Sequence, residues 1–436
     1  MKRAGIIYYL IRPIARFSIW MYYRKIHWSH AGRVPKGKPV ILAVNHPTGF
    51  SEPVIMAVTM HRPLYYLVRG DFFRNPVFGF LMRSLNMVPI YRRSDTDFRG
   101  VAQNLSTFEA CYQTLKANRI ICIFPEGSTR HEKKLRPLQK GLGRIAHGYM
   151  ERFPETEELY VVPVGVNYTY AELPRTQVMI DFGEPINVAD IYRAHPDNRM
   201  RMVSELTRTL HQHMAERIVR IDDQDREELA EYLFRLVRSE QPDPFLPVIT
   251  KRYQPLAREL SVAEWVRRVS EEEMTQGLMV ARPYFEQLKD LGIRDRTMVG
   301  PSYYTWTNSL LLVLTAPLVA VGYMFCWPPW ALAKWIKETK VKRIEFHTPV
   351  LQSAALGVFL VYYLIWAVLS IVWGDWRIIG AAIILGWLGY ASIWWQENFA
   401  RWQHSQRFLR LDEKVRLELK QKRAKLVQLI DKLPRE

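Results

Sequence analysis

The sequence predicts an α/β fold, a mixed sheet flanked by helices, followed by a helical region and by transmembrane helices toward the C-terminus. Short apolar runs alternate with helical patterns through residues 35–190, and this alternation is typical of a sheet with helices on both faces. Two much longer apolar runs come late in the chain, at 351–373 and 378–395. The composition, 48% hydrophobic and 13% aromatic over 436 residues, indicates a folded protein and excludes a disordered one.

Five apolar runs are predicted to be strands of this sheet because they are short and bounded by turn residues. They are residues 39–44, 64–68, 87–91, 120–124 and 160–167. Residues 104–116 between them have a helical pattern, with Asn118 near the C-terminal end of that helix. We therefore place one α/β domain at residues 35–190.

Two helical parts flank this domain. Residues 1–34 begin with an apolar stretch that Arg12 and Arg16 interrupt, which favours a helix lying in the membrane interface over a spanning helix. A core-packed amphipathic helix is the alternative for that stretch. Residues 191–300 are charged and are predicted to be a helical linker or insertion, in which Ser261 is a plausible N-cap.

Residues 301–400 are predicted to be the membrane region. The runs at 351–373 and 378–395 are long enough to cross a bilayer, which needs about 20 apolar residues. A buried soluble bundle is the alternative for these two runs. A third run at 309–333 is interrupted by a proline, and we predict that it is re-entrant, with a bend at residues 315–317.

Basic residues flank the apolar runs and bear on orientation. They are Lys334, Lys337, Lys340, Lys342 and Arg343 before the first span, and Arg401, Arg407, Arg410 and Lys414 after the second. Positive residues favour the cytoplasmic side, and a re-entrant run keeps them all on the side of the α/β domain. We predict an integral membrane protein with a cytoplasmic catalytic domain, in the inner membrane if the cell is bacterial, and a charged C-terminal helix at 401–436.

The first candidate for chemistry is the loop after the strand at 39–44, which holds His46 and Glu52 within one short stretch. A carboxylate that hydrogen-bonds one imidazole nitrogen orients the ring and leaves the other nitrogen free as a base. Such a pair suits deprotonation of a hydroxyl that attacks a thioester. An ordinary surface pair is the alternative interpretation of the same two residues.

Two further segments favour binding of an anion. Arg92 and Arg93 directly follow the strand at 87–91, and two guanidinium groups at a strand end can grip a phosphate. The strand at 120–124 runs into a polar turn in which a glycine permits close backbone approach to an anion. A solvated basic loop is the alternative for the arginines, and a turn before a basic helix is the alternative for the second segment. The residues of that turn are Glu126, Gly127, Ser128, Thr129 and Arg130.

Taken in order, these segments and the strand around Pro163 resemble the glycerolipid acyltransferase family, which includes glycerol-3-phosphate and 1-acylglycerol-3-phosphate (lysophosphatidate) acyltransferases. The resemblance covers roughly residues 35–190, and residues 182–186 also look like the family's closing strand and turn. It implies the acyltransferase fold and a catalytic His46 oriented by Glu52. It also implies that the acceptor is bound by the second and third blocks, which hold Arg92, Arg93, Glu126, Gly127, Ser128, Thr129 and Arg130.

One position departs from the family's common pattern. The carboxylate usually follows the histidine by five positions, where this chain has Ser51, and Glu52 comes one position later. The chain resembles the subset of the family with the longer His-Pro…acid-Pro block, with Glu in place of Asp, and the extra methylene lets Glu reach the imidazole. The departure is also the best support for the alternative of a non-catalytic membrane lipid-binding protein.

The resemblance implies transfer of a fatty acyl group from acyl-CoA or acyl-carrier protein to a hydroxyl of glycerol 3-phosphate or lysophosphatidate in phospholipid synthesis. No metal, no other cofactor and no covalent acyl-enzyme is expected. Another lysophospholipid acyltransferase is the runner-up, and the longer first block tilts the choice slightly toward glycerol 3-phosphate. The net charge of +18 suits anionic membrane lipids and phosphorylated substrates as partners. Nucleic acid is not expected, because no nucleic-acid module is visible and two spans are predicted.

Overall fold

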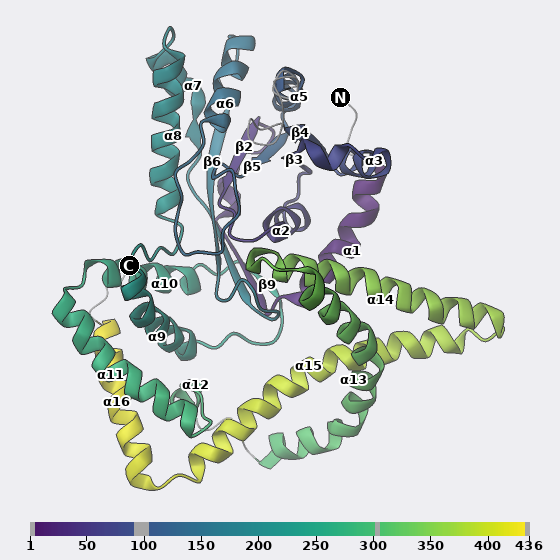
Figure 1. The fold of residues 1–436 in the computed structure, drawn as a ribbon, viewed down its shortest axis with the longest axis vertical. Helices are drawn as coiled ribbons and strands as arrows, with labels where there is room; N and C mark the ends of the chain where they lie inside the picture. The colour runs from purple at the N-terminus through teal and green to yellow at the C-terminus, as the bar shows by residue number, and fades with distance from the viewer. Residues whose placement is uncertain (1–4, 91–103, 301–305, 432–436) are drawn as a thin grey trace. The chain divides into compact units, whose positions relative to one another are not determined.

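The structure, a computed structural model, describes residues 5–90, 104–300 and 306–431 (Figure 1). The chain forms two compact units. The first unit comprises Met1–Ile218, Val248–Tyr253 and Arg343–Pro349, and the second comprises Val219–Pro247, Gln254–Lys342 and Val350–Glu436. The first unit therefore gathers two short segments from far along the chain, and its main part ends at Ile218.

A mixed sheet forms the centre of the first unit, with the strand order β4-β3-β5-β2-β6-β7-β1-β9 and with β8 paired to β6. The five predicted strands are all present. Neighbours from β4 to β6 are parallel, β7 is antiparallel to β6, and β1 and β9 run in the direction of β7. The strands are β1 (Lys25–Ser29), β2 (Val40–Val44), β3 (Leu64–Arg69), β4 (Met87–Ile90), β5 (Ile120–Ile123), β6 (Tyr160–Tyr168), β7 (Gln177–Phe182), β8 (Ile186–Asn187) and β9 (Ile249–Thr250).

Helices cover both faces of this sheet, which confirms the predicted fold class. On one face α5, α6 and α8 bury a core around Ile41, Ile121 and Leu206, whereas α1 and α2 lie together on the other side of the sheet in Figure 1. Strands buried on both faces need apolar side chains at consecutive positions, and this need explains their continuous apolar runs. The helices are α1 (Ile6–Tyr22), α2 (Ser51–Thr59), α3 (Pro76–Ser84), α5 (Asn104–Lys116), α6 (Gly141–Arg152), α7 (Val188–Ala194) and α8 (Arg199–Ala215).

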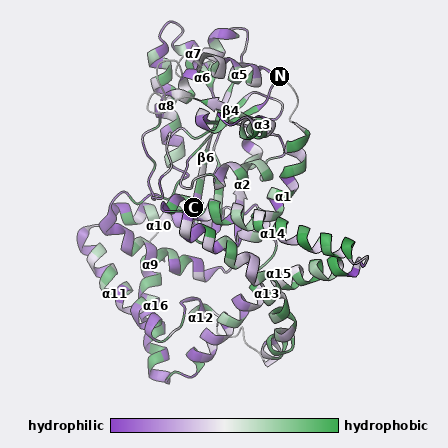
Figure 2. Ribbon diagram, turned by 45° about the vertical axis from the view of Figure 1, so that its right-hand side comes forward, coloured by the Kyte–Doolittle hydropathy of each residue, from purple (hydrophilic) through white to green (hydrophobic). Residues whose placement is uncertain are grey.

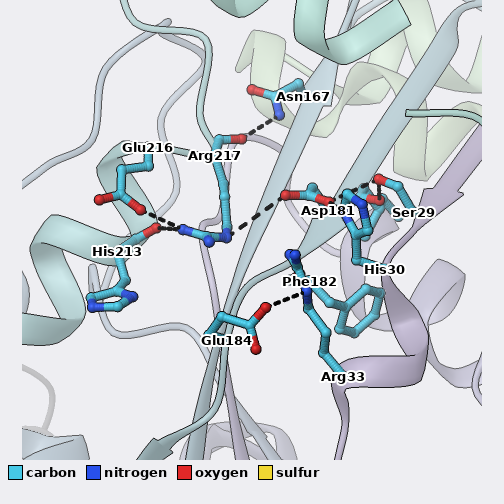
Figure 3. Close-up of polar contacts among 11 residues, drawn as sticks. Ser29, His30, Arg33, Asn167, Asp181, Phe182, Glu184, His213, Glu216 and Arg217 are labelled. Atoms are coloured by element: carbon cyan, nitrogen blue, oxygen red, sulfur yellow. Dashed lines mark hydrogen bonds and ion pairs between the residues drawn. The ribbon is translucent and has the colours of Figure 1, made fainter. Parts of the chain in front are cut away.

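A buried carboxylate ties the antiparallel part of the sheet together (Figure 3). Asp181 in β7 is 2% exposed and accepts a hydrogen bond from Ser29 Oγ at 2.9 Å, and its Oδ1 lies 2.6 Å from His30 Nδ1. The guanidinium of Arg217, after α8, lies 3.7 Å from the other oxygen. Among the described residues no hydrogen bond joins Ser29 to His30, so the cluster lacks the geometry of a serine-hydrolase triad. It compensates a buried charge and joins β1, β7 and the turn after α8.

Five further helices belong to the second unit. Arg423 in α16 contacts Asp295 at 3.0 Å, and Tyr284 in α11 donates to the same carboxylate. Ser261, predicted as an N-cap, lies inside a helix, and the next helix begins instead at a capping box formed by Ser270 and its third following residue. The helices are α9 (Gln224–Glu240), α10 (Gln254–Arg268), α11 (Glu271–Asp290), α12 (Arg296–Val299) and α16 (Glu413–Asp431).

Three long apolar helices complete the second unit: α13 (Trp306–Lys340), α14 (His347–Val372, whose first turn counts with the first unit) and α15 (Arg377–Leu409). Each is long and apolar enough to cross a membrane, and Figure 2 shows α14 in particular as strongly hydrophobic. The α13–α15 contact is close, because a Cβ at Gly322 would lie 2.4 Å from the backbone nitrogen of Gly389. Apolar surface exposed on this scale indicates a membrane protein.

α13 continues as one helix through the predicted bend at residues 315–317, including Thr315 and Pro317. A proline removes one backbone donor and clashes with the preceding turn, which kinks a helix but does not always end it. Thr315 Oγ1 donates to Leu311 O at 2.7 Å, in keeping with a continuous helix. The helix is visibly curved in Figure 1, and whether it re-enters the membrane stays a prediction.

Candidate active site

Three chain segments meet at one edge of the sheet. β2, β5 and β6 are parallel neighbours, so their C-terminal ends lie at the same edge, where open α/β sheets bind ligands. The Asn45 side chain fixes the end of β2, since its amide donates to Val166 O at 2.9 Å and accepts from Val166 N–H at 2.7 Å. The loops that follow carry His46 after β2 and Glu126 after β5.

His46 and Glu52, which the sequence predicted as a pair, are in hydrogen-bond contact. Glu52 lies in the first turn of α2, and its Oε2 is 2.9 Å from His46 Nδ1. The imidazole stacks on Phe124 with the ring centroids 4.2 Å apart. Because an ionised carboxylate only accepts hydrogen bonds, Nδ1 carries the proton and Nε2 keeps a lone pair. In the described part of the chain nothing hydrogen-bonds to Nε2, and the His46 side chain is 16% exposed, so a ligand can reach it.

The Glu52 carboxylate is fully buried and held by three donors besides the histidine. Its Oε1 accepts from Thr48 N–H at 3.1 Å, from Thr48 Oγ1 at 2.7 Å and from Tyr168 OH at 3.0 Å. Burial and the adjacent Glu52 charge raise the pKa of Tyr168 well above its ordinary value, so the phenol stays protonated and donates. The donors fix the carboxylate, and the carboxylate in turn fixes the plane of the imidazole.

Glu126, predicted to bind the acceptor, links the loop after β2 to the turn after β5. One of its oxygens accepts the backbone N–H of His46 at 3.1 Å, and the other accepts from Arg136 Nε at 2.6 Å. The Glu126 side chain is 3% exposed and that of Arg136 is 15% exposed. Arg136 also donates to the hydroxyl and to the carbonyl of Ser128. The carboxylate is thus engaged with protein donors on both oxygens.

The remaining turn residues differ in what they offer. Gly127 has a φ of +73°, which favours glycine, and its N–H donates to Phe124 O at 3.1 Å, so this amide is engaged within the turn. Ser128 is held by Arg136, as described above. Thr129 is half-buried and Arg130 is exposed, and none of the described residues forms an ion pair with Arg130. Arg130 is therefore the turn residue with a cation available to an anion.

Arg92 and Arg93, predicted to grip the acceptor's phosphate, lie outside the described residues. The strand before them, β4, is present and is parallel to β3, so the chain enters that segment at the same edge of the sheet as His46. Pro163, from the fourth block, lies buried in β6.

Sequence reasoning missed the residues that hold the pair in place. Thr48 lies between His46 and Glu52 in the sequence, but nothing in the sequence pattern shows that it donates two hydrogen bonds to Glu52. Tyr168 and Asn45 act across strand neighbours, and Arg136 was only one member of a basic stretch. The available signal was the position of Asn45 and Tyr168 directly at strand ends, where a polar side chain next to a buried run needs a partner.

An exposed apolar surface lies on α1 and α3, which contact each other where the Cβ position of Gly5 is 3.3 Å from Ser84 O. The exposed side chains on α1 agree with the predicted interface helix, and those on and just before α3 extend the surface. Contiguous exposed apolar side chains mark an interaction with a membrane or with another protein. They are Ile6, Leu10, Ile14, Phe17, Phe72, Val77, Phe78 and Phe80.

Known proteins share these loops. Residues 25–167 match the family model described as Acyltransferase. Glycerol-3-phosphate O-acyltransferase 1 of Saccharomyces cerevisiae is 30% identical over 106 residues, which is 24% of this chain and 14% of the yeast protein. The 1-acyl-sn-glycerol-3-phosphate acyltransferase of Streptococcus pneumoniae is 23% identical over 192 residues, 44% of this chain and 66% of that protein. Among solved structures, the 1-acyl-sn-glycerophosphate acyltransferase PlsC of Thermotoga maritima has a TM-score of 0.34 and 18% identity, covering 47% of this chain and 80% of that one.

The matched region runs from β1 to the end of β6 and so includes both loops of the candidate site. The chain spans only a small part of the yeast relative and just under two thirds of the streptococcal one. The family match, the two kinds of relative and the predicted motif residues in the matched region agree. Residues 25–167 therefore form a domain that matches the Acyltransferase family and is similar to glycerol-3-phosphate and 1-acylglycerol-3-phosphate acyltransferases.

Proposed function

We propose that the chain transfers a fatty acyl group from a thioester donor, acyl-CoA or acyl-carrier protein, to a hydroxyl of glycerol 3-phosphate or lysophosphatidate. The relatives supply the acceptor class, since their names state acyl transfer to glycerol 3-phosphate and to 1-acyl-sn-glycerol-3-phosphate. Glycerol 3-phosphate is favoured slightly, because of the longer first block.

One observation carries this proposal: the 2.9 Å contact between His46 Nδ1 and a Glu52 carboxylate that is itself completely buried. A buried carboxylate with four hydrogen-bond contacts cannot rotate away, so the imidazole, whose side chain is 16% exposed, is held in one orientation. A fixed, partly exposed imidazole lone pair is the arrangement that a general base needs.

The reaction then proceeds without a covalent acyl-enzyme. Nε2 of His46 takes the proton of the acceptor hydroxyl while that oxygen attacks the thioester carbonyl carbon. The tetrahedral intermediate collapses as the carbon–sulfur bond breaks, and the imidazolium returns its proton to the leaving thiolate, so that ester and free thiol are the products. General-base assistance of this kind contributes about 10²–10⁴-fold to the rate.

Arginine side chains at the edge of the site bind the acceptor. Arg130 offers an exposed guanidinium, and β4, which Arg92 and Arg93 follow in the sequence, ends at the same edge of the sheet. Glu126 acts indirectly, because both of its oxygens already accept hydrogen bonds from His46 and Arg136. Its contribution is to hold the loop that carries His46 and the turn after β5 in a fixed position relative to each other.

The membrane supplies the setting for this chemistry. Apolar side chains on α1 and α3 and the three long apolar helices bring the first unit to a bilayer, where acyl chains and lysolipid reside. Positive residues flank α13, α14 and α15, which favours a cytoplasmic catalytic domain, in the inner membrane if the cell is bacterial.

The test is acyl transfer by the purified full-length chain, with free thiol and labelled product both measured. Acyl-CoA and acyl-carrier protein serve as donors, and glycerol 3-phosphate, lysophosphatidate and other lysophospholipids serve as acceptors. We expect His46→Ala to lower kcat by about 10²–10⁴-fold while membrane association persists. His61→Ala, at an exposed histidine after α2, is the matched control and should keep full activity.

Two outcomes would count against the proposal. A His46→Ala enzyme with substantial activity would remove His46 from the role of base. A wild-type chain that binds lysolipid vesicles but releases no thiol with any acceptor would favour the alternative of a non-catalytic membrane lipid-binding protein.

A further inference from the structure

A segment from the membrane region is docked on the loop that carries His46. Residues Arg343–Pro349, called here the connecting segment, join α13 to α14, yet they pack as part of the first unit. They lie nearly 300 positions after the loop in the sequence, and outside the 25–167 region that matches the family model. Their contacts fall on three parts of the candidate site.

The first contact is with Gly49, which lies between His46 and Glu52. The Gly49 N–H donates to Glu345 O at 2.8 Å, and the Phe346 ring lies against the glycine. A Cβ at position 49 would come within 2.5 Å of the Phe346 Cδ1, so this ring fills the space that a side chain would occupy. Gly49 is not among the glycines with positive φ, so its backbone conformation does not require glycine.

The second contact is with the turn after β5. Arg343 donates to Thr129 O at 3.3 Å, forms an ion pair with Glu345 at 3.2 Å, and lies over the Phe346 ring. Burial opposes ionisation of Glu345, but hydrogen bonding to Arg343 and the nearby positive charges of Arg343 and His131 outweigh it and lower the pKa of the carboxyl. The ion pair therefore persists at neutral pH and orients the guanidinium toward the turn.

The third contact anchors the segment to the body of the first unit. Thr348 is 1% exposed, and its hydroxyl donates to Ala171 O at 2.5 Å while accepting from Tyr22 OH at 3.3 Å. Burial raises the pKa of Tyr22 to about 12, so its hydroxyl remains a donor. The segment is thereby tied both to α1 and to the chain just beyond β6.

We propose that the connecting segment is a positioning element for the His46–Glu52 pair. The inference rests on the proposed function. Thr48, which donates twice to Glu52, directly precedes the Gly49 amide that the segment holds. Displacing Gly49 therefore displaces Thr48, then the carboxylate, then the imidazole, and small misplacements of reacting groups can cost about 10²-fold in rate.

A rescue experiment on the full-length chain separates this role from simple packing. Gly49→Ala should lower kcat by about 10- to 100-fold with little change in KM, because its methyl group meets the Phe346 ring. Phe346→Ala should have a smaller effect, and adding it to Gly49→Ala should restore kcat to the level of Phe346→Ala alone. Ile344→Ala, at an exposed position of the same segment, is the matched control and should leave kcat unchanged.

Full activity of Gly49→Ala would overturn the proposal, and so would a double variant as slow as Gly49→Ala. A readout without turnover keeps the proposed function separate: amide hydrogen exchange of the peptide covering residues 45–52. We expect faster exchange there in Phe346→Ala and not in Ile344→Ala. That result with an inactive wild-type chain would reject acyl transfer and keep the docking, whereas unchanged exchange in an active enzyme would reject the docking alone.

Discussion

Glu52 shows how a one-residue change in spacing is absorbed at the scale of single side chains. Glu52 lies in the first turn of α2, and its side chain, one methylene longer than that of aspartate, reaches His46 Nδ1 at 2.9 Å. The pair was predictable, because a turn between a strand and a helix can bring two reactive groups six positions apart within reach of each other. Thr48 and Tyr168 were not, since their contacts with Glu52 depend on the turn conformation and on the neighbouring strand.

The Glu126–Arg136 pair yields a prediction at the same scale. Both side chains are largely buried, so removing one partner leaves an uncompensated charge, which costs about 3–5 kcal/mol in such pairs. We expect Arg136→Met to lower the free energy of unfolding by an amount of this order and to lower kcat as the turn loosens. Thermal and denaturant unfolding of the purified chain measure the first effect.

The controls for this pair follow from burial. Adding Glu126→Gln to Arg136→Met removes the negative charge that Glu126 keeps when Arg136 is lost. The double variant should therefore recover part of the lost stability. Arg193→Met breaks an exposed ion pair with Asp190 and should change stability little. Equal loss in Arg136→Met and Arg193→Met would show that the Glu126–Arg136 pair is no more important than a surface contact.

At the scale of whole elements, strands with continuous apolar runs were predictable and strands with polar residues were not. The predicted helix at 104–116 matches α5, and the runs at 39–44 and 120–124 match β2 and β5 closely. β1 reads Lys-Ile-His-Trp-Ser and gives no apolar run, although all five residues are buried. β9 has two residues, and only its pairing with β1 makes it a strand. Local periodicity cannot reveal an element that exists because of a distant partner.

The course of α13 in the membrane follows from connectivity. Tyr253 and Arg343 both belong to the first unit, so the chain between them crosses the membrane an even number of times if that whole unit lies on one side of it. In the described part of that interval α13 is the single helix long and apolar enough to cross. We therefore infer that α13 enters and leaves the bilayer on the side of the catalytic domain.

Contacts along α13 suit this path. Ser309 accepts from Trp402 Nε1 at 2.9 Å near the charged end of α15, whereas Gly322 meets the middle of α15. Beyond that point Pro329 deprives Phe325 O of its helical donor, and Tyr362 OH replaces it at 3.2 Å. Pro328 and Pro329 therefore offer a second place for a bend besides residues 315–317, although α13 is one continuous helix through both.

Cysteine labelling measures the topology of these helices. Thr307→Cys, Lys342→Cys and Trp376→Cys are introduced one at a time in a Cys326→Ala background, in which the remaining Cys111 and Cys122 are buried. Each variant is exposed to a membrane-impermeant maleimide in intact cells and in inverted vesicles. We expect positions 307 and 342 to label from the side of the catalytic domain, and position 376, in the turn between α14 and α15, to label from the other side. Labelling of 307 and 342 from opposite sides would contradict the path inferred for α13.

The whole molecule joins a family domain of about a third of the chain to helices that the family match does not cover. The sequence predicted the long apolar helices, because composition changes sharply where their apolar runs begin. It did not predict that residues 248–253 and 343–349 return to the first unit, since neither segment has a pattern that distinguishes it from a linker. The +18 charge and the exposed apolar side chains of α1 suit an anionic lipid surface.

The most direct measurement of the central claim is a double-variant cycle on kcat, with His46→Ala, Glu52→Gln and the two combined in the full-length chain. If Glu52 acts only through the imidazole, Glu52→Gln alone should lower kcat, and the combined variant should be no slower than His46→Ala. Losses that multiply in the combined variant would show that the two side chains act separately, and a fully active Glu52→Gln chain would show that the carboxylate does not orient the base.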